Sequence, residues 1–170
     1  MSVYSSFLLP TRKMLHHLDT WLAKAITYSE ARSFDVNLLL ASRLAPDQYP
    51  LVKQVQSACD SAKLGAARLT GKTPPVHPDT ETTMEELRAR VEAVVTWLDT
   101  LTPEDFAGCD TRDIHLPFAS GKVMQGRDYV MEMALPNFYF HTCMAYAILR
   151  HNGVELGKRD YIGPLTLREA

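Results

Sequence analysis

Apolar residues recur every three or four positions along four long segments of the chain, and this periodicity limits the fold more than any other feature. An α-helix has 3.6 residues per turn, so residues at this spacing share one face, which must be buried against other elements. The predicted helices span residues 6–30, from 49 or 50 to 69, from 82 or 83 to 101, and 134–153. Four amphipathic helices are typical of a bundle, so the sequence predicts an all-α fold.

Residues that start and stop helices support these bounds. Pro136 suits a first helical turn, where its missing N–H would have no partner, and Gly71 and Gly153 are typical of residues just past a helix end. Residues 127–135 also show helical spacing and lead into the last helix, which predicts a kink at Pro136.

The connections between the helices differ in composition. Residues 34–48 predict a structured crossover with one short helical turn, and residues 72–80, with three prolines, predict an extended loop. Residues 110–125 contain two short segments around a glycine turn and predict a small β-hairpin before the last helix. Because Pro117 cannot donate a hydrogen bond within a sheet, we expect this hairpin to be an appendage packed on the bundle and not the core of a sheet. The tail, residues 154–170, is expected to lie against the bundle without regular structure.

Length and charge restrict the domain count and the partners. A chain of 170 residues can bury one hydrophobic core without help from disulfides or metal ions, so residues 1–170 are predicted to form a single domain. The net charge of −2 is spread over mixed acids and bases, which argues against nucleic acid as a partner. No apolar run approaches the ~20 residues that cross a bilayer, and residues 1–13 lack a signal-peptide layout, so the prediction is a cytoplasmic protein with no membrane partner.

The cysteines and the common catalytic motifs suggest no chemistry. Cys59, Cys109 and Cys143 lie far apart and form no CxxC pair, which argues against a disulfide framework and a cysteine zinc site. HExxH, GxSxG and glycine-rich phosphate loops are missing from the sequence, so no nucleophilic triad is proposed.

His141 is the strongest candidate for a functional residue, because it falls inside the apolar stripe of the last predicted helix. Asn137 lies one turn earlier on the same side, and Gln56 falls inside the stripe of the second helix, with Asp60 one turn further on. Such a cluster is expected to hold a water, a small ligand or a weakly bound metal. The alternative is a structural network in which His141 is a hydrogen-bonded core residue.

The other histidines are weaker candidates. His16 and His17 are adjacent, so their side chains point about 100° apart on a helix and do not form a chelating pair. His151 suits the last helical turn, where a cation complements the helix dipole. His77 and His115 lie in a loop and in the hairpin without a partner at ligand spacing.

A second face of the last helix carries aromatic and basic side chains, namely Tyr139, Thr142, Tyr146 and Arg150. Two interpretations stay open: packing against the tail or hairpin, and a homodimer surface, since Tyr and Arg are favoured in interface cores.

Three stretches carry a resemblance that covers nearly the whole chain: KMLHHLDTWLAKA (13–25), LAPDQYPLVKQVQSACDSAKLGAARL (44–69) and LPNFYFHTCMAYAILRHNGVELGKRDYIG (135–163). They resemble the DUF1993 family of uncharacterised proteins, which is similar to the DinB/YfiT-like superfamily. The resemblance implies a four-helix bundle with a long crossover, frequently a homodimer.

The resemblance also suggests a metal. Metal-binding relatives use one histidine on the second helix and a late pair four residues apart to hold a divalent ion such as nickel or zinc. Here His141 matches one of the late pair, but Asn137 and Ala145 occupy the positions one turn away, and Gln56 stands where the second helix would supply a histidine. Amides are weaker ligands than imidazoles, so we expect no tightly bound metal.

The preferred hypothesis is therefore a DinB-like bundle that binds a small ligand at a site formed by His141, Asn137, Gln56 and Asp60. One alternative is a divalent-metal-dependent transferase or hydrolase with His141 as a ligand. The other is a metal-free interaction or structural module.

Overall fold

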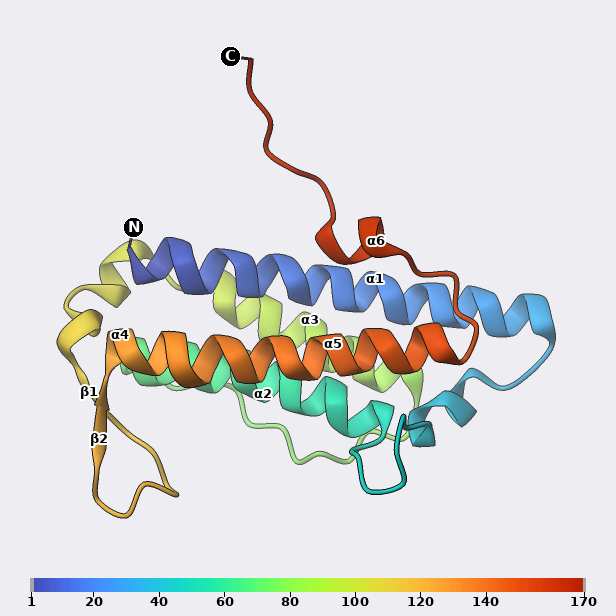
Figure 1. Cartoon of the computed structure of the whole chain (residues 1–170), viewed down its shortest axis with the longest axis horizontal. Helices are drawn as coiled ribbons and strands as arrows, with labels where there is room; N and C mark the ends of the chain where they lie inside the picture. Colours follow the sequence, from blue (N-terminus) through green and yellow to red (C-terminus); the bar gives the residue numbers. More distant parts are fainter. Residues whose placement is uncertain (1, 170) are drawn as a thin grey trace.

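Four long helices dominate the computed structural model of the protein, which describes residues 2–169 (Figure 1). They are α1 (Leu9–Arg32), α2 (Leu51–Thr70), α3 (Met84–Asp99) and α5 (Leu135–His151). The short helical elements are η1 (Tyr4–Leu8), η2 (Val36–Ala41), η3 (Pro103–Phe106), η4 (Cys109–Thr111), α4 (Gly126–Asp128), η5 (Tyr129–Ala134) and α6 (Lys158–Ile162). None of the helices within residues 2–169 is both long and apolar enough to cross a membrane.

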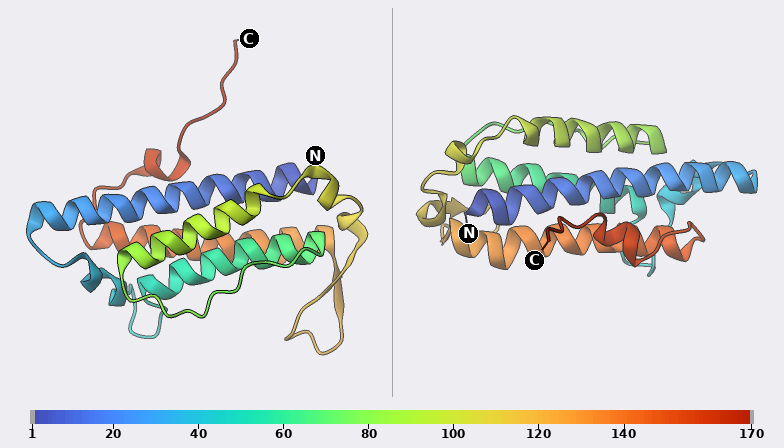
Figure 2. Two further views of the ribbon diagram at one scale, coloured as in Figure 1. Left: turned by 180° about the vertical axis from the view of Figure 1, so that it is seen from behind. Right: turned by 90° about the horizontal axis from the view of Figure 1, so that it is seen from above.

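The long helices form the predicted bundle. Helices α1 and α5 run in one direction, and α2 and α3 run in the other (Figures 1 and 2). Both α1 and α2 pack against α3 and against α5 but make few contacts with each other, so α1 and α2 occupy diagonally opposite positions in the bundle. The four apolar stripes meet in one core, with the fully buried Trp21 and Phe138 among its largest side chains. The all-α prediction is confirmed.

The long crossover lies in a different segment from the one predicted. Because α2 and α3 are parallel, residues 71–83 must return along the length of the bundle, and they do so beside α2 (Figure 1). Residues 34–48, which the sequence suggested for this role, contain the short helix η2 and stay near one end of the bundle. Prolines keep the true crossover extended, since they have no N–H to donate to a helix or sheet.

A buried arginine fastens the crossover to the helices. The Arg90 side chain on α3 is 1% exposed, and its guanidinium contacts carboxylates of Asp60 on α2 at 2.7 Å, Asp79 at 2.6 Å and Glu81 at 3.0 Å. Asp79 and Glu81 belong to the crossover, so one cation joins three segments. A buried charge is tolerated when it is paired in this way.

The same contacts keep the crossover carboxylates charged. Burial raises the pKa of Asp79, but hydrogen bonds from Lys53 and Arg90 outweigh it, so this pKa lies below its ordinary value. For Glu81, burial is likewise outweighed by hydrogen bonds from Arg90, its own backbone and Gln56, and the pKa is lowered. Each carboxylate therefore adds stability above its ordinary pKa, and the contribution disappears as the pH falls through the lowered value.

A π-helical segment leads directly into each of α1 and α5, and a proline follows shortly after it. η1 precedes Pro10 and η5 precedes Pro136, each proline standing at the second position of the α-helix that follows. Proline lacks an N–H and crowds the carbonyl four residues earlier, and a wider π turn is one way for a helix to accommodate such a disturbance. At Pro136 the π turn lies where the sequence predicted a kink.

The hairpin and the tail complete the fold. Strand β1 (Asp113–His115) pairs antiparallel with β2 (Val123–Gln125), with Ile114 opposite Met124, as a small appendage. The tail was predicted to lack regular structure, which is wrong for residues 158–162. There α6 packs on α1, because Trp21 donates a hydrogen bond to the Asp160 carbonyl at 3.1 Å and stacks on the Tyr161 ring.

The Arg90 contacts lead to a stability prediction. Arg90→Met should lower the free energy of unfolding by about 3–5 kcal/mol, because it leaves three carboxylates without their shared cation. Urea unfolding followed by circular dichroism measures the change. Lys53→Met is the matched control, since Lys53 also contacts Asp79 but its side chain is 43% exposed; it should cost less than about 1 kcal/mol. Equal losses in the two variants would contradict the assignment.

Candidate functional site

His141 lies at the contact between α5 and α2 and is 9% exposed. Its ring nitrogen Nδ1 is 2.8 Å from Oε1 of Gln54 on α2. The ring stacks on Tyr49 at a centroid distance of 6.5 Å and meets the Phe140 ring edge to face at 5.3 Å. The imidazole is therefore fixed by one hydrogen bond and two aromatic neighbours.

The hydrogen bonds around Gln54 determine the tautomer of His141. The Gln54 amide nitrogen donates to the Tyr49 carbonyl at 3.1 Å, so the amide oxygen is the atom that faces the imidazole. An oxygen acceptor requires a proton on Nδ1, which leaves Nε2 of the neutral ring with a free lone pair. Burial lowers the pKa of His141, so the neutral form prevails near pH 7. Among residues 2–169, Nε2 has no hydrogen-bond partner.

A cavity of about 290 Å³ opens between α2 and α5 beside this ring. It contains three of the four side chains predicted to form a site, His141, Asn137 and Asp60. Asn137 donates to the Ser61 hydroxyl at 2.7 Å. Asp60 contacts Arg90 at 2.7 Å and Lys63 at 3.0 Å. The lining residues are Tyr49, Ser57, Asp60, Ser61, Leu64, Arg68, Tyr129, Met133, Ala134, Asn137 and His141.

Gln56, the fourth predicted residue, lies on the other side of α2. Its amide donates to Glu81 in the crossover at 2.7 Å, and its backbone carbonyl faces Arg90. Two residues along a helix turn the side chain by about 200°, so Gln54 and not Gln56 meets His141. A second set of α2 residues recurs at three or four positions, and this periodicity is the signal that would have identified the residues facing α5: Gln54, Ser57, Ser61, Leu64 and Arg68.

The remaining histidines make separate contacts. His77 Nδ1 lies 2.8 Å from the Lys63 ammonium, and burial together with Lys63 and Arg90 lowers the pKa of His77. His17 bonds the Tyr161 carbonyl at 3.0 Å. Within residues 2–169, no three His, Cys, Asp or Glu side chains lie close enough together to hold a metal ion.

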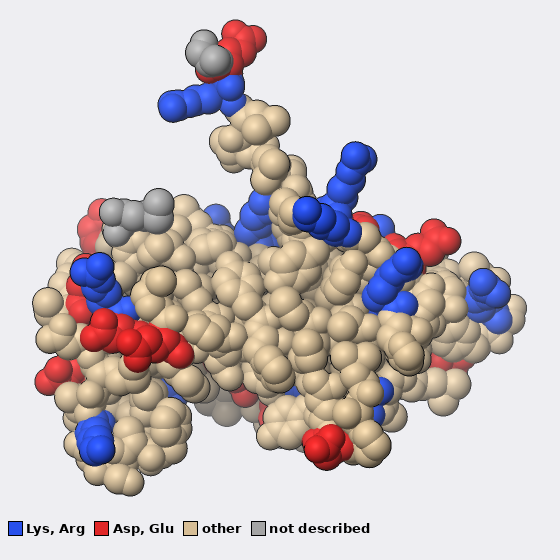
Figure 3. All heavy atoms as spheres, in the orientation of Figure 1, with Lys and Arg blue, Asp and Glu red and all other residues tan. Residues whose placement is uncertain are grey.

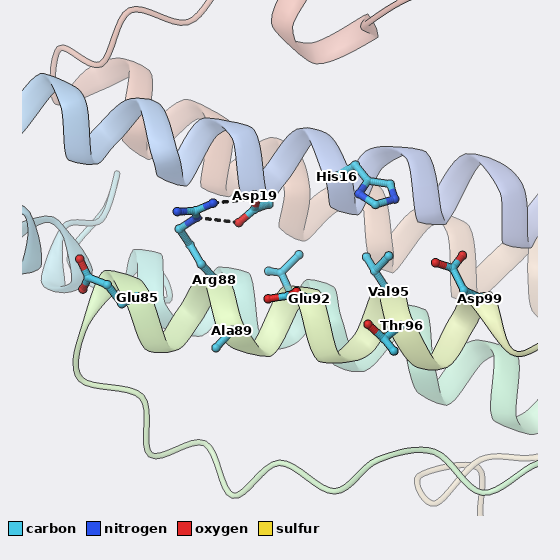
Figure 4. A pocket seen from close by; sticks show the side chains of 10 residues that line it. His16, Asp19, Glu85, Arg88, Ala89, Glu92, Val95, Thr96 and Asp99 are labelled. Atoms are coloured by element: carbon cyan, nitrogen blue, oxygen red, sulfur yellow. Dashed lines mark hydrogen bonds and ion pairs between the residues drawn. The ribbon is translucent and has the colours of Figure 1, made fainter.

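A larger groove, of about 590 Å³, lies between α1 and α3 (Figure 4). Its main feature is the pair of Arg88 and Asp19, whose atoms form two hydrogen bonds of 2.7 and 3.1 Å between the helices. His16 lies on the groove wall and is exposed. The charges at the centre of the groove bind each other and join the two helices. The α2–α5 cavity, in contrast, is lined by a histidine whose ring is held in a fixed orientation.

The outer surface of α5 bears on the dimer hypothesis. Tyr146 packs against Trp21 and Tyr161, which agrees with the interpretation that it contacts the tail. Between Met133 and Leu149 the helix has no charged residue, and charged side chains are sparse over the middle of the face in Figure 3. On this helix, the Phe140 side chain is 52% exposed. The homodimer stays a prediction.

The four-helix bundle of this chain is that of DinB-like proteins. A crystal structure of a DinB family member protein from Shewanella denitrificans superposes with a TM-score of 0.95 at 45% sequence identity, covering 99% of this chain and 96% of that one. A family profile described as "Domain of unknown function (DUF1993)" matches residues 3–162, so the chain belongs to the DUF1993 family. The comparison with curated proteins finds no match.

The contact between Gln54 and His141 predicts strong coupling between the two residues. Gln54→Met should lower the free energy of unfolding by about 1–3 kcal/mol, since it leaves the Nδ1–H buried without an acceptor. The double variant Gln54→Met/His141→Phe removes both polar groups and should recover part of that loss. Urea unfolding of the two single variants and the double variant completes the cycle. Additive losses would contradict the contact.

Proposed function

We propose that the protein binds a small organic molecule in the α2–α5 cavity, where Nε2 of His141 accepts a hydrogen bond from it. The observation that carries this proposal is the hydrogen-bond series from the Tyr49 carbonyl through Gln54 to His141. This series holds the imidazole of His141 in the tautomer whose Nε2 has a free lone pair, and His141 is one of the residues that line the cavity. Binding sites combine a concave, partly apolar wall with a few polar groups held in fixed orientations.

The remaining polar groups support binding more than catalysis. Ser61 donates its proton to the Ser57 carbonyl at 2.6 Å, and within residues 2–169 neither serine hydroxyl is hydrogen-bonded to His141. A nucleophile activated by a base needs that contact. Asn137 adds an amide whose oxygen can accept a further hydrogen bond from a ligand.

The metal-dependent alternative fits the cavity less well. His141 Nε2 is a suitable ligand atom, but α5 places Asn137 and Ala145 one turn to either side, and Gln56 faces the crossover. Asp60 is engaged by Arg90 and Lys63. A single imidazole with amides does not match the ligand sets that hold zinc or nickel.

Matched aromatic probes test the proposal. Phenol can donate to Nε2 and pack beside Tyr49, whereas anisole has a similar shape and no donor. Phenol should bind about two- to tenfold more tightly than anisole, the range expected for one hydrogen bond. In His141→Phe this difference should disappear. Chemical-shift changes in ¹⁵N-labelled protein give both affinities and the location of the bound probe.

Two further variants distinguish cavity binding from surface binding. Ser57→Met fills the cavity and should abolish phenol binding. Ala67→Met makes a similar change at a half-buried position of α2 that does not line the cavity, and it should leave binding unchanged. Binding that survives Ser57→Met, or a phenol preference that survives His141→Phe, would refute the proposal. Adding nickel or zinc to each sample tests the metal alternative directly.

A further inference from the structure

The charges that line the α2–α5 cavity are not balanced. Among its lining residues in the described chain, Arg68 is the one cation and Asp60 the one acid. Asp60 is already neutralised by two cations from outside the lining set, Arg90 and Lys63. For Arg68, the hydrogen bond recorded within residues 2–169 is to the Tyr129 hydroxyl, and no carboxylate lies within ion-pair distance of its guanidinium. The cavity therefore has one uncompensated positive charge.

Arg68 is held in place by an aromatic residue. Its Nη1 donates to the Tyr129 hydroxyl at 3.0 Å, and its guanidinium carbon lies 5.8 Å from the centroid of the Tyr129 ring. Tyr129 is 2% exposed, so this support is rigid. Within residues 2–169 the other N–H groups of the guanidinium have no hydrogen-bond partner, so they can bind an oxyanion in the planar, two-point geometry that arginine favours.

Arg68 is not needed to cap the free carbonyls at the C-terminal end of α2. A cation in the last helical turn can neutralise free carbonyls, but Arg112 already donates to the Leu69 carbonyl at 2.8 Å. The N–H of Gly71 bonds the Ala67 carbonyl at 2.7 Å. The helix terminus is thus capped by other groups, and the arginine faces the cavity instead.

We infer that the ligand of this cavity is an elongated carboxylic acid whose carboxylate binds Arg68 and whose far end donates a hydrogen bond to His141; the inference rests on the proposed function. One arginine matches the single charge of a carboxylate, whereas phosphate sites usually gather several cations or backbone N–H groups. Ser57 and Arg68 are the first and last α2 residues that line the cavity, and they are separated by about 16 Å along the helix axis at 1.5 Å per residue. Leu64, Met133 and Ala134 line the cavity with apolar surface. An acid with an aliphatic middle and a terminal hydroxyl meets these conditions.

The experiment compares ω-hydroxy carboxylic acids, from hexanoate to dodecanoate, with their methyl esters. The ester keeps the chain and the hydroxyl but loses the charge. In the wild-type protein, at least one acid of the series should bind about tenfold more tightly than its ester by isothermal titration calorimetry. That preference should weaken at high salt, because ions screen a partly exposed pair.

Two substitutions assign the effect to one residue. Arg68→Gln should remove the preference for the acid, so that the acid and its ester bind with similar affinity. Arg32→Gln is the matched control: Arg32 also lies in the last turn of its helix, with its guanidinium carbon 5.8 Å from the centroid of Tyr28, but it does not line the cavity. The control should keep the wild-type preference.

Three results would overturn the inference: equal binding of acid and ester, an acid preference that persists in Arg68→Gln, or no binding of any acid in the series. The comparison of acid with ester in the wild-type protein needs no variant, so poor folding of Arg68→Gln does not affect it. Phenol binding distinguishes failure of the anionic-ligand inference from failure of the proposed function. If phenol binds in the cavity while the acids show no preference, the anionic ligand is refuted and the proposed function stands.

Discussion

The buried ion cluster at Arg90 is the interaction on which the arrangement of α2, α3 and the crossover depends. Parallel neighbours α2 and α3 require a connection as long as the bundle, and an extended, proline-containing segment has no hydrogen-bond ladder of its own to hold it in place. Arg90 supplies the attachment by binding Asp79 and Glu81 of the crossover and Asp60 of α2 at once. The carboxylates in turn make a buried arginine tolerable.

This cluster also shapes the candidate site, since Asp60 belongs to both. Its carboxylate binds Arg90 and Lys63 and also lines the cavity between α2 and α5. The acid is therefore neutralised from one side of α2 while Arg68 remains uncompensated on the other. Helix α2 thus has two polar faces with different roles: Gln56 and Lys63 stabilise the crossover, and Gln54 orients His141.

How far the sequence reveals the fold depends on the range of the interactions involved. Helical periodicity and local end signals are properties of neighbouring residues, and they placed the four helices to within a few positions. The capping box of Thr83 and Glu86 at the start of α3 is of this kind. The identity of the crossover depends on helix direction, which is settled by packing between distant segments, so the sequence favoured residues 34–48 over residues 71–83.

The candidate site shows the same division. His141 and Asn137 are recognisable because a polar residue inside an apolar stripe breaks a local pattern. Gln54 and Arg68 sit on a mixed face of α2 that resembles a solvated one, and their role appears when α5 is packed against it. Arg90 looks like an ordinary surface residue of an amphipathic helix, and its burial depends on a crossover that folds over it.

The most direct test of this account is the protonation of His141, measured by ¹⁵N NMR of the imidazole nitrogens across a pH titration. We expect a proton on Nδ1, no proton on Nε2 of the neutral ring, and a pKa below the ordinary value of 6.5, since burial disfavours the charged ring. With a lowered folded-state pKa, His141 adds stability above pH 6.5 that is lost as the pH falls through the folded value. A proton on Nε2 in the neutral ring, or a pKa at or above 6.5, would contradict the oriented imidazole on which the proposed function rests.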